Sequence, residues 1–120
     1  MKTNSRRGTG NRGEEMAVRY LEKMGYCIIE RNFIFQHGEI DIIARDGNEL
    51  VFVEVKLRRG SNFGTPEDSI TERKQNLLRR TAEGYLVVHH IDEISCRFDV
   101  VAIQIDGSRT EYRLYKNAIV

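Results

Sequence analysis

The chain has 120 residues, of which 40% are hydrophobic and 31% are charged. This length suits one domain, and the composition is typical of a folded globular protein rather than a disordered one. No stretch approaches the roughly 18 apolar residues of a membrane span, and the first 13 residues have no signal-peptide character, so we expect one cytoplasmic domain with no membrane contact.

The N-terminal segment is the most basic part of the chain. Residues 1–13 contain no acidic residue and four basic ones, which are Lys2, Arg6, Arg7 and Arg12. The rest of the chain has 15 basic residues (19 minus 4) against 18 acidic ones, a balance of −3, although the whole chain carries +1. We interpret residues 1–12 as a flexible basic arm and 13–120 as the folded domain. Such an arm can follow phosphates, and an ordinary solvated terminus explains the pattern equally well.

Hydrophobic spacing predicts two helices. Glu14 to Met24 should form the first, because Ala17, Tyr20, Leu21 and Met24 lie at helical spacing and Gly25 is a natural stop. The second helix follows a loop that contains glycine, with Ser69 and Glu72 as a capping box at its start. Its inward residues are Ile70, Leu77, Leu78, Thr81, Ala82 and Tyr85.

Five runs of apolar and β-branched residues predict strands. Three lie between the helices, at Tyr26–Phe35, Glu39–Arg45 and Leu50–Leu57, and two follow, at Cys96–Ile105 and Thr110–Tyr115. The order is therefore α-β-β-β-α-β-β. This predicts an α/β fold in which helices flank a mixed sheet.

The second and third strands should form a β-hairpin around Gly47-Asn48. With this loop, paired residue numbers sum to 95, which places Asp41 opposite Glu54 and Glu39 opposite Lys56. An Asp46-Gly47 loop would shift the pairing by two and keep the same four residues on one face. Directly paired residues share one face of a sheet. One face is predicted to be apolar and to pack on the core, with Ile40, Ile42, Ala44, Val51, Val53 and Val55. The other carries Glu39, Asp41, Glu54 and Lys56.

This charged face has the composition of a metal site. Carboxylates at short range repel one another unless a cation lies between them. Their oxygens are the ligands that Mg²⁺ prefers, and Mn²⁺ accepts similar donors. A lysine beside such an ion can stabilise charge on a phosphate or act on water. A solvated face with cross-strand salt bridges is the alternative explanation.

Two charged residues on the predicted helices favour the site. Glu14 lies three residues before Ala17 and so extends the inward stripe of the first helix, whereas Glu15 points sideways. Lys74 lies on the inward stripe of the second helix. A charged group on an inward face needs a partner, and the sheet cluster would supply one to each.

The spacing from Asp41 to Glu54 and Lys56 resembles the PD-(D/E)XK pattern of restriction-endonuclease-like nucleases, which often place a further glutamate on the first helix, as Glu14 would. Archaeal Holliday-junction resolvases look similar in layout. Three blocks resemble the YraN-like family more closely, over nearly the whole chain: GEIDIIA at 38–44, FVEVKLR at 52–58 and RFDVV at 97–101. Ile40 replaces the proline of the wider pattern. The resemblance implies a restriction-endonuclease-like fold and nuclease activity.

The favoured hypothesis is a metal-dependent endonuclease that acts on branched or junction DNA. Asp41, Glu54 and the Val55 carbonyl would hold Mg²⁺ or Mn²⁺, Lys56 would act on the attacking water, and Glu14 would orient that water or a second ion. Glu39 and Lys74 would support these groups. Candidate nucleic-acid contacts are Arg12, Arg58, Arg59, Lys74, Gln75 and Arg79. Rival readings are a nucleic-acid-binding module without cleavage and a structural protein whose charges form salt bridges. A homodimer is compatible with either activity.

Two further expectations concern residues outside this cluster. Cys27 and Cys96 should be buried, reduced thiols. Asp99 shares a strand face with Val101 and Ile103, so we expect it to be buried against a backbone donor or an arginine rather than to act in catalysis.

Overall fold

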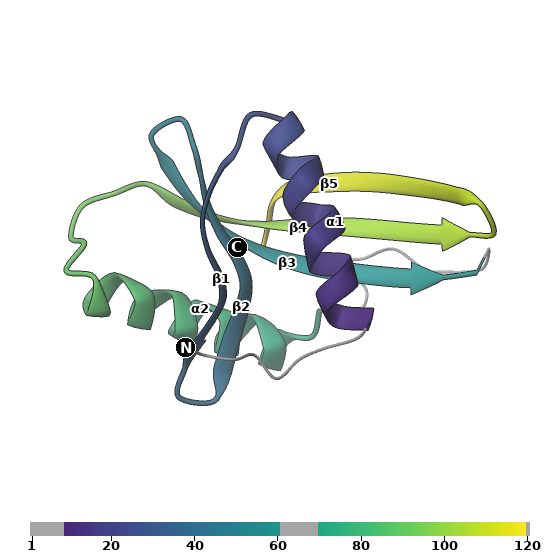
Figure 1. Ribbon diagram of the computed structural model, residues 1–120. Helices are drawn as coiled ribbons and strands as arrows, with labels where there is room; N and C mark the ends of the chain where they lie inside the picture. The colour runs from purple at the N-terminus through teal and green to yellow at the C-terminus, as the bar shows by residue number, and fades with distance from the viewer. Residues whose placement is uncertain (1–8, 61–69, 120) are drawn as a thin grey trace.

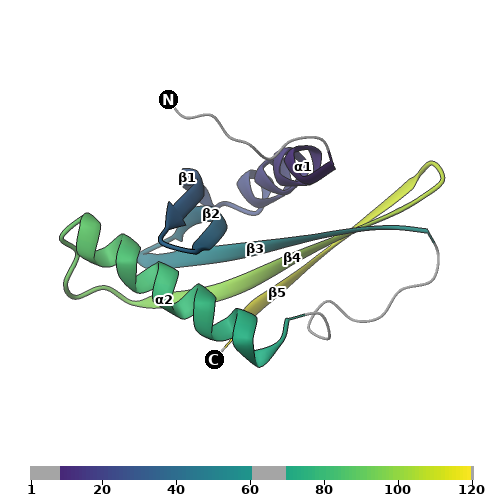
Figure 2. The same ribbon diagram turned by 90° about the horizontal axis from the view of Figure 1, so that it is seen from below.

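The computed structural model of the protein describes residues 9–60 and 70–119. In these residues five strands form one sheet, in the order β1-β2-β3-β4-β5, with a helix on each face (Figures 1 and 2). The elements are α1 (Thr9–Lys23), β1 (Cys27–Phe35), β2 (Gly38–Asp46), β3 (Glu49–Arg59), α2 (Glu72–Val88), β4 (Cys96–Asp106) and β5 (Arg109–Ile119). The predicted α/β fold and the order α-β-β-β-α-β-β are confirmed.

The direction of the strands explains the position of the helices. Strands β1, β2 and β3 pair antiparallel through short turns, and so do β4 and β5, whereas β3 and β4 run parallel. A parallel pair needs a long crossover, and α2 lies in this crossover. Figure 2 shows α2 on one side of the sheet and α1 on the other. Both faces of the sheet are therefore covered.

Each helix covers its own apolar cluster. Ala17 and Leu21 of α1 pack with Ile42, Val53 and Val101 from the sheet. On the opposite face, the buried residues of α2 pack against Ile43, Phe52, Val100 and others; those α2 residues are Leu78, Ala82 and Tyr85. The predicted inward stripe of the second helix is confirmed, because Ile70 and Thr81 are buried as well.

The register of the β2–β3 hairpin is the predicted one. Asp46 pairs with Glu49 and Ile42 pairs with Val53, so paired numbers sum to 95. Gly47 in the turn has a φ of 65°, which the tight hairpin turn requires and glycine adopts without strain. The pairing stops at Ile42 and Val53, so the predicted pairs of Asp41 with Glu54 and of Glu39 with Lys56 do not form. Beyond that pair, β2 leads away from β3 with β1 (Figure 1).

A backbone irregularity in β1 and β2 overturns the predicted position of Ile40. Arg31 pairs with Ile42 and Phe33 pairs with Ile40. Ile42 packs on the α1 side, but Phe33 and Ile40 pack on the α2 side. The regular alternation of side chains between the two faces of the sheet is therefore broken at Asn32 in β1 and at Asp41 in β2. Asn32 lies at this point of β1, and its φ of 53° places it in the left-handed region, which asparagine enters more readily than most residues.

Both helices begin at other residues than predicted. α1 begins at Thr9, so residues 9–12, which we expected in the basic arm, are helical; it ends at Lys23, and Met24 is exposed rather than inward. The N-cap of α2 is Thr71, whose side chain accepts a hydrogen bond from the Lys74 N–H. Ser69, the predicted cap, lies outside the described residues.

The expected burial of the cysteines was wrong, although both are free thiols, and the expectation for Asp99 is confirmed. Cys27 and Cys96 are both free and exposed, because each opens a strand at the margin of the sheet. Asp99 is fully buried, and its carboxylate accepts hydrogen bonds from Arg97, Tyr26 and the Asn117 N–H.

Among the residues that the structure describes, no helix is long and apolar enough to cross a membrane.

Gly84 marks a close contact between α2 and β1 and supports a first prediction. A Cβ at this position would overlap the ring of Phe35. Gly84→Ala should therefore lower the free energy of unfolding by about 1–3 kcal/mol, since overpacking outweighs the better helix propensity of alanine. Urea unfolding measures this. Glu83→Ala, at an exposed neighbouring position of the same helix, should change stability by less than about 0.5 kcal/mol; equal effects would contradict the packing argument.

Candidate functional site

A cavity of about 530 Å³ opens where β2 separates from β3. Residues from α1, the β1–β2 hairpin, β3 and α2 form its walls. Its charged lining consists of Glu14, Glu39, Asp41, Glu54, Lys56 and Lys74, and the other lining residues are Gly13, His37, Val55, Leu57, Leu77 and Leu78. The structure thus brings together every predicted catalytic and supporting residue, although these are up to 60 positions apart in the chain.

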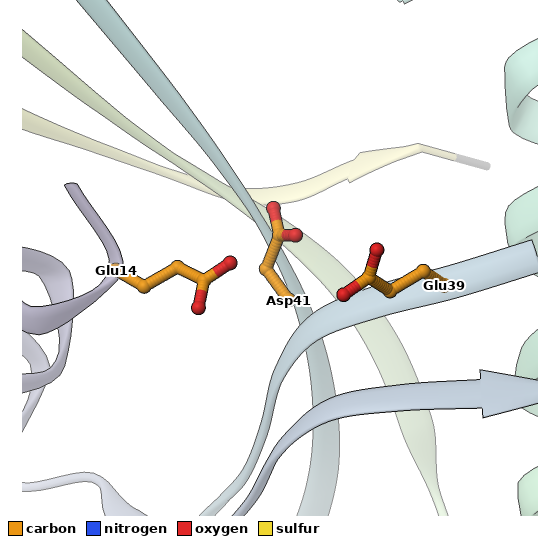
Figure 3. A group of neighbouring side chains, drawn as sticks. All are labelled: Glu14, Glu39 and Asp41. Carbon is orange, nitrogen blue, oxygen red and sulfur yellow. The ribbon is translucent and has the colours of Figure 1, made fainter. Parts of the chain in front are cut away.

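Three of the carboxyl groups form a tight group within this cavity. Oxygen atoms of Glu14, Glu39 and Asp41 all lie within 4.8 Å of one another. In Figure 3 the side chain of Glu14 from α1 and that of Glu39 from β2 approach Asp41 from opposite sides. Glu14 is only 4% exposed, whereas Glu15 is exposed and pairs with Arg31. The prediction that Glu14 rather than Glu15 faces the cluster is confirmed.

The side chain of Asp41 is hydrogen-bonded to the part of β3 that no longer pairs with β2. Its carboxylate accepts a hydrogen bond of 2.8 Å from the Val55 N–H, which lies beyond the last β2–β3 pair. A strand residue directs its N–H and its C=O toward the same neighbouring strand. The Val55 carbonyl therefore faces the cavity as well, which is the position that the predicted ligand set requires.

Glu54 has a different environment from the other three carboxylates. It is 6% exposed, and one of its oxygens lies 3.2 Å from Lys74 Nζ and 3.7 Å from Lys56 Nζ. The predicted contact of Lys74 with the cluster is confirmed. Two lysines thus hold Glu54, whereas Asp41 lies between Glu14 and Glu39. The sequence predicts the Asp41–Glu54 pair as the centre of the site; both residues line one cavity, but the tightest acidic group consists of Glu14, Glu39 and Asp41.

The carboxyl of Asp41 has a strongly perturbed pKa. Burial and the negative charge of Glu54 raise this pKa from 3.8 to about 8, and the charges of Glu14 and Glu39 act in the same direction. The hydrogen bond from Val55 opposes the change, because it favours the ionised form. Ionised Asp41 is therefore unfavourable in this cavity unless a cation compensates it.

This raised pKa makes stability depend on pH in a defined direction. Between pH about 4 and about 8 the folded protein holds a proton on Asp41 that the unfolded chain has released. The free energy of unfolding of the apo protein should therefore fall as pH rises through this window, with a contribution of at most about 1.4 kcal/mol per pH unit. Stability from this group is fully present below pH about 4 and is lost above pH about 8.

Asp41→Asn tests this prediction. Asparagine retains an oxygen that can accept the Val55 N–H and carries no charge, so the variant should be at least as stable as the wild type at pH 8 in EDTA. Its stability advantage should shrink as pH is lowered toward 4. Denaturant unfolding between pH 4 and pH 9 measures the difference, with Asp106→Asn, at an exposed position, as the control. A difference that does not change with pH would contradict the raised pKa.

Sequence reasoning missed Asn32. Its side-chain amide donates hydrogen bonds to both oxygens of Glu14, at 2.9 Å each, and to Glu39 at 3.1 Å. A lone asparagine inside a strand-like run carries a weak signal for an irregular backbone, because asparagine is depleted in strands and enriched at positive φ. Nothing in the local sequence could indicate its carboxylate partners.

The predicted nucleic-acid contacts are distributed more widely than the cavity. Of the six, Lys74 lines it, while Arg12 and Arg58 adjoin the lining residues Gly13 and Leu57. Gln75 donates a hydrogen bond to the Ile70 carbonyl. Arg59 is exposed at the end of β3, and Arg79 donates to Asn76.

The donor set fits a hard divalent cation. Carboxylate oxygens with one backbone carbonyl suit Mg²⁺ or Mn²⁺, which prefer oxygen ligands. Mg²⁺ binds oxygen at about 2.1 Å, so oxygens on opposite sides of one ion lie about 4.2 Å apart. The 4.8 Å limit within the group of Glu14, Glu39 and Asp41 is close to this value.

Comparison with known sequences identifies the family. The model of the uncharacterised protein family UPF0102 matches residues 13–103, which include all the cavity residues. The chain belongs to this family. It is thereby confirmed as a member of the YraN-like family, because that is the same family. A UPF0102 protein of Symbiobacterium thermophilum is 48% identical over 93% of this chain and 96% of its own length, and one of Desulforamulus reducens is 46% identical over 95% and 97%.

Proposed function

We propose that this UPF0102 protein is a metal-dependent endonuclease that cleaves DNA, with branched or junction DNA as its preferred substrate. One observation carries the proposal. Four carboxyl groups and two lysines from α1, β2, β3 and α2 line a single cavity. A protein that used these residues only for salt bridges would gain nothing from a group of three carboxylates around Asp41. The resemblance to PD-(D/E)XK nucleases and Holliday-junction resolvases supports the same function.

The residues divide into ion-holding and phosphate-facing groups. Asp41, Glu54 and the Val55 carbonyl would hold Mg²⁺ or Mn²⁺, with Glu14 and Glu39 as neighbouring oxygen donors. The ion would neutralise charge on the scissile phosphate. Lysine carries three N–H donors, so Lys56 can donate to a phosphate oxygen or hold the attacking water while it stays near Glu54. Glu14 would accept a hydrogen bond from that water.

The basic residues around the cavity suit the backbone of a nucleic acid. Lys56 and Arg58 lie two positions apart on β3 and so point to the same face of the sheet. Lys74 approaches from α2 on that face. Phosphate contacts position a nucleic acid without reading its sequence, which suits an enzyme that recognises structure.

A cleavage screen tests the proposal. The purified protein would be incubated with labelled four-way junction, flap, nicked and linear DNA and with RNA, each with EDTA, Mg²⁺ or Mn²⁺. We expect cleavage of a branched DNA that requires metal and is absent in Asp41→Asn. If the wild type binds DNA but cleaves none of these substrates, the result would instead favour a nucleic-acid-binding module without cleavage.

Thermal melts supply a readout that does not depend on the substrate. A cation that binds only the folded state at 100 times its Kd adds about 2.7 kcal/mol of stability, so metal should raise the melting temperature of the wild type. Asp41→Asn should respond much less. Equal responses would show that Asp41 is not a ligand and would contradict the proposed site.

A further inference from the structure

Asn32 connects the two glutamates that flank Asp41. Its amide nitrogen lies 2.9 Å from each oxygen of Glu14 and 3.1 Å from Oε2 of Glu39. These residues come from β1, α1 and β2, so one side chain links three elements at the wall of the cavity. A purely structural hydrogen bond needs only one acceptor, whereas this amide contacts two carboxylates.

The chemistry of the amide suits this place. Two carboxylates at short range repel each other, and an amide NH₂ group offers two donors without a charge. It can therefore hold both carboxylates and leave intact the negative charge that attracts a cation. Arg31 approaches Glu14 only to 3.8 Å and forms a shorter contact, 3.0 Å, with Glu15.

The backbone of Asn32 contributes separately from its side chain. Its φ of 53° lies at the point where the alternation of β1 and β2 reverses, between the Arg31–Ile42 and Phe33–Ile40 pairs. Asp41 lies between Ile40 and Ile42, at the reversal. A test must therefore keep this backbone conformation while it removes the amide.

We infer that Asn32 is a positioning residue that sets the spacing of Glu14 and Glu39 beside Asp41 for a divalent cation. This inference rests on the proposed function, because it requires a metal in the cavity. Asn32 acts through the two glutamates and does not itself contact the ion or the phosphate.

Asn32→Gly is the informative variant, because glycine adopts positive φ without strain. Asn117→Gly is its matched control, since Asn117 also has a positive φ, 55°, and lies on β5 outside the cavity. Mn²⁺ binding would be titrated by electron paramagnetic resonance, and melting would be followed in EDTA. We expect Asn32→Gly to melt near the wild type in EDTA and to bind Mn²⁺ 10–100-fold more weakly, the usual range for residues that orient metal ligands. Asn117→Gly should bind Mn²⁺ as the wild type does.

A double variant tests whether Asn32 acts through Glu39 even if Asn32→Gly by itself lowers the stability of the fold. If Asn32 acts through Glu39, then Asn32→Gly should weaken Mn²⁺ binding less in a Glu39→Gln background than in the wild type, because residues in one network are not additive. Additive losses would overturn the inference, and so would an Asn32→Gly variant that binds Mn²⁺ normally. A wild type that binds Mn²⁺ but cuts nothing would contradict the proposed function alone, whereas a wild type that binds no Mn²⁺ would overturn both.

Discussion

Lys56→Ala should reduce metal-dependent cleavage by about 10²–10³-fold, the usual effect of removing one group that stabilises transition-state charge. Lys56 is 20% exposed and lies 3.7 Å from Glu54, so it reaches the cavity without being fixed to one partner. The variant should still bind Mn²⁺, because lysine acts on phosphate or water rather than on the ion. Single-turnover cleavage and Mn²⁺-dependent melting measure the two properties separately.

Lys74→Ala is the matched control for this prediction. Lys74 contacts the same oxygen of Glu54 at 3.2 Å but comes from α2 and is 40% exposed. If both lysines only neutralised Glu54, the two variants would lose cleavage and metal binding to the same extent. We expect the cleavage rate to fall much more in Lys56→Ala. Unchanged cleavage in Lys56→Ala would remove this residue from the mechanism.

Asp99→Ala should cause the largest loss of stability, about 3–5 kcal/mol, as expected when one partner of a buried ion pair is removed. Arg97 Nε lies 2.9 Å from one Asp99 oxygen, and the Tyr26 hydroxyl lies 2.8 Å from the other. Burial and the bond to Asp99 raise the pKa of Tyr26, so its hydroxyl stays a donor. A typical domain has only about 5–15 kcal/mol of stability, and the loss would be a large fraction of that. Urea unfolding measures it.

A second variant keeps this prediction testable if Asp99→Ala does not fold. The double variant Arg97→Met with Asp99→Leu replaces the charges by apolar groups and should recover part of the lost stability. Glu111→Ala removes an exposed partner of Arg113 at 3.6 Å and should change stability by less than about 1 kcal/mol. An effect of Asp99→Ala no larger than that of Glu111→Ala would show that the buried network contributes little.

Local patterns in the sequence sufficed for the elements and for much of the site. The Gly47-Asn48 turn set the hairpin register correctly, because a two-residue loop allows few arrangements of its strands. Helical spacing placed Glu14 and Lys74 on inward faces, because helix periodicity does not depend on distant residues. These rules were enough to select all the charged residues that line the cavity.

The predictions for Ile40 and for the burial of both cysteines failed where tertiary contacts override local preference. Strict alternation predicts Ile40 on the face of Ile42, but Ile40 packs on the other side of the sheet, where its β1 partner Phe33 follows the left-handed Asn32. Cys27 and Cys96 looked like core residues, but they open strands at the sheet margin and are exposed. Hydrophobic type predicts burial only on average.

The sequence by itself determined the α/β order, the hairpin register and the identity of the charged residues, because periodicity and turn chemistry act over a few positions. Only the tertiary structure decided how those charges are grouped. The separation of β2 from β3 opens the cavity, and the reversal at Asn32 turns the chain on either side of Asp41. Asp41 thus lies among Glu14 and Glu39 while two lysines hold Glu54. This grouping depends on contacts between α1, β1, β2 and α2, which no local pattern contains.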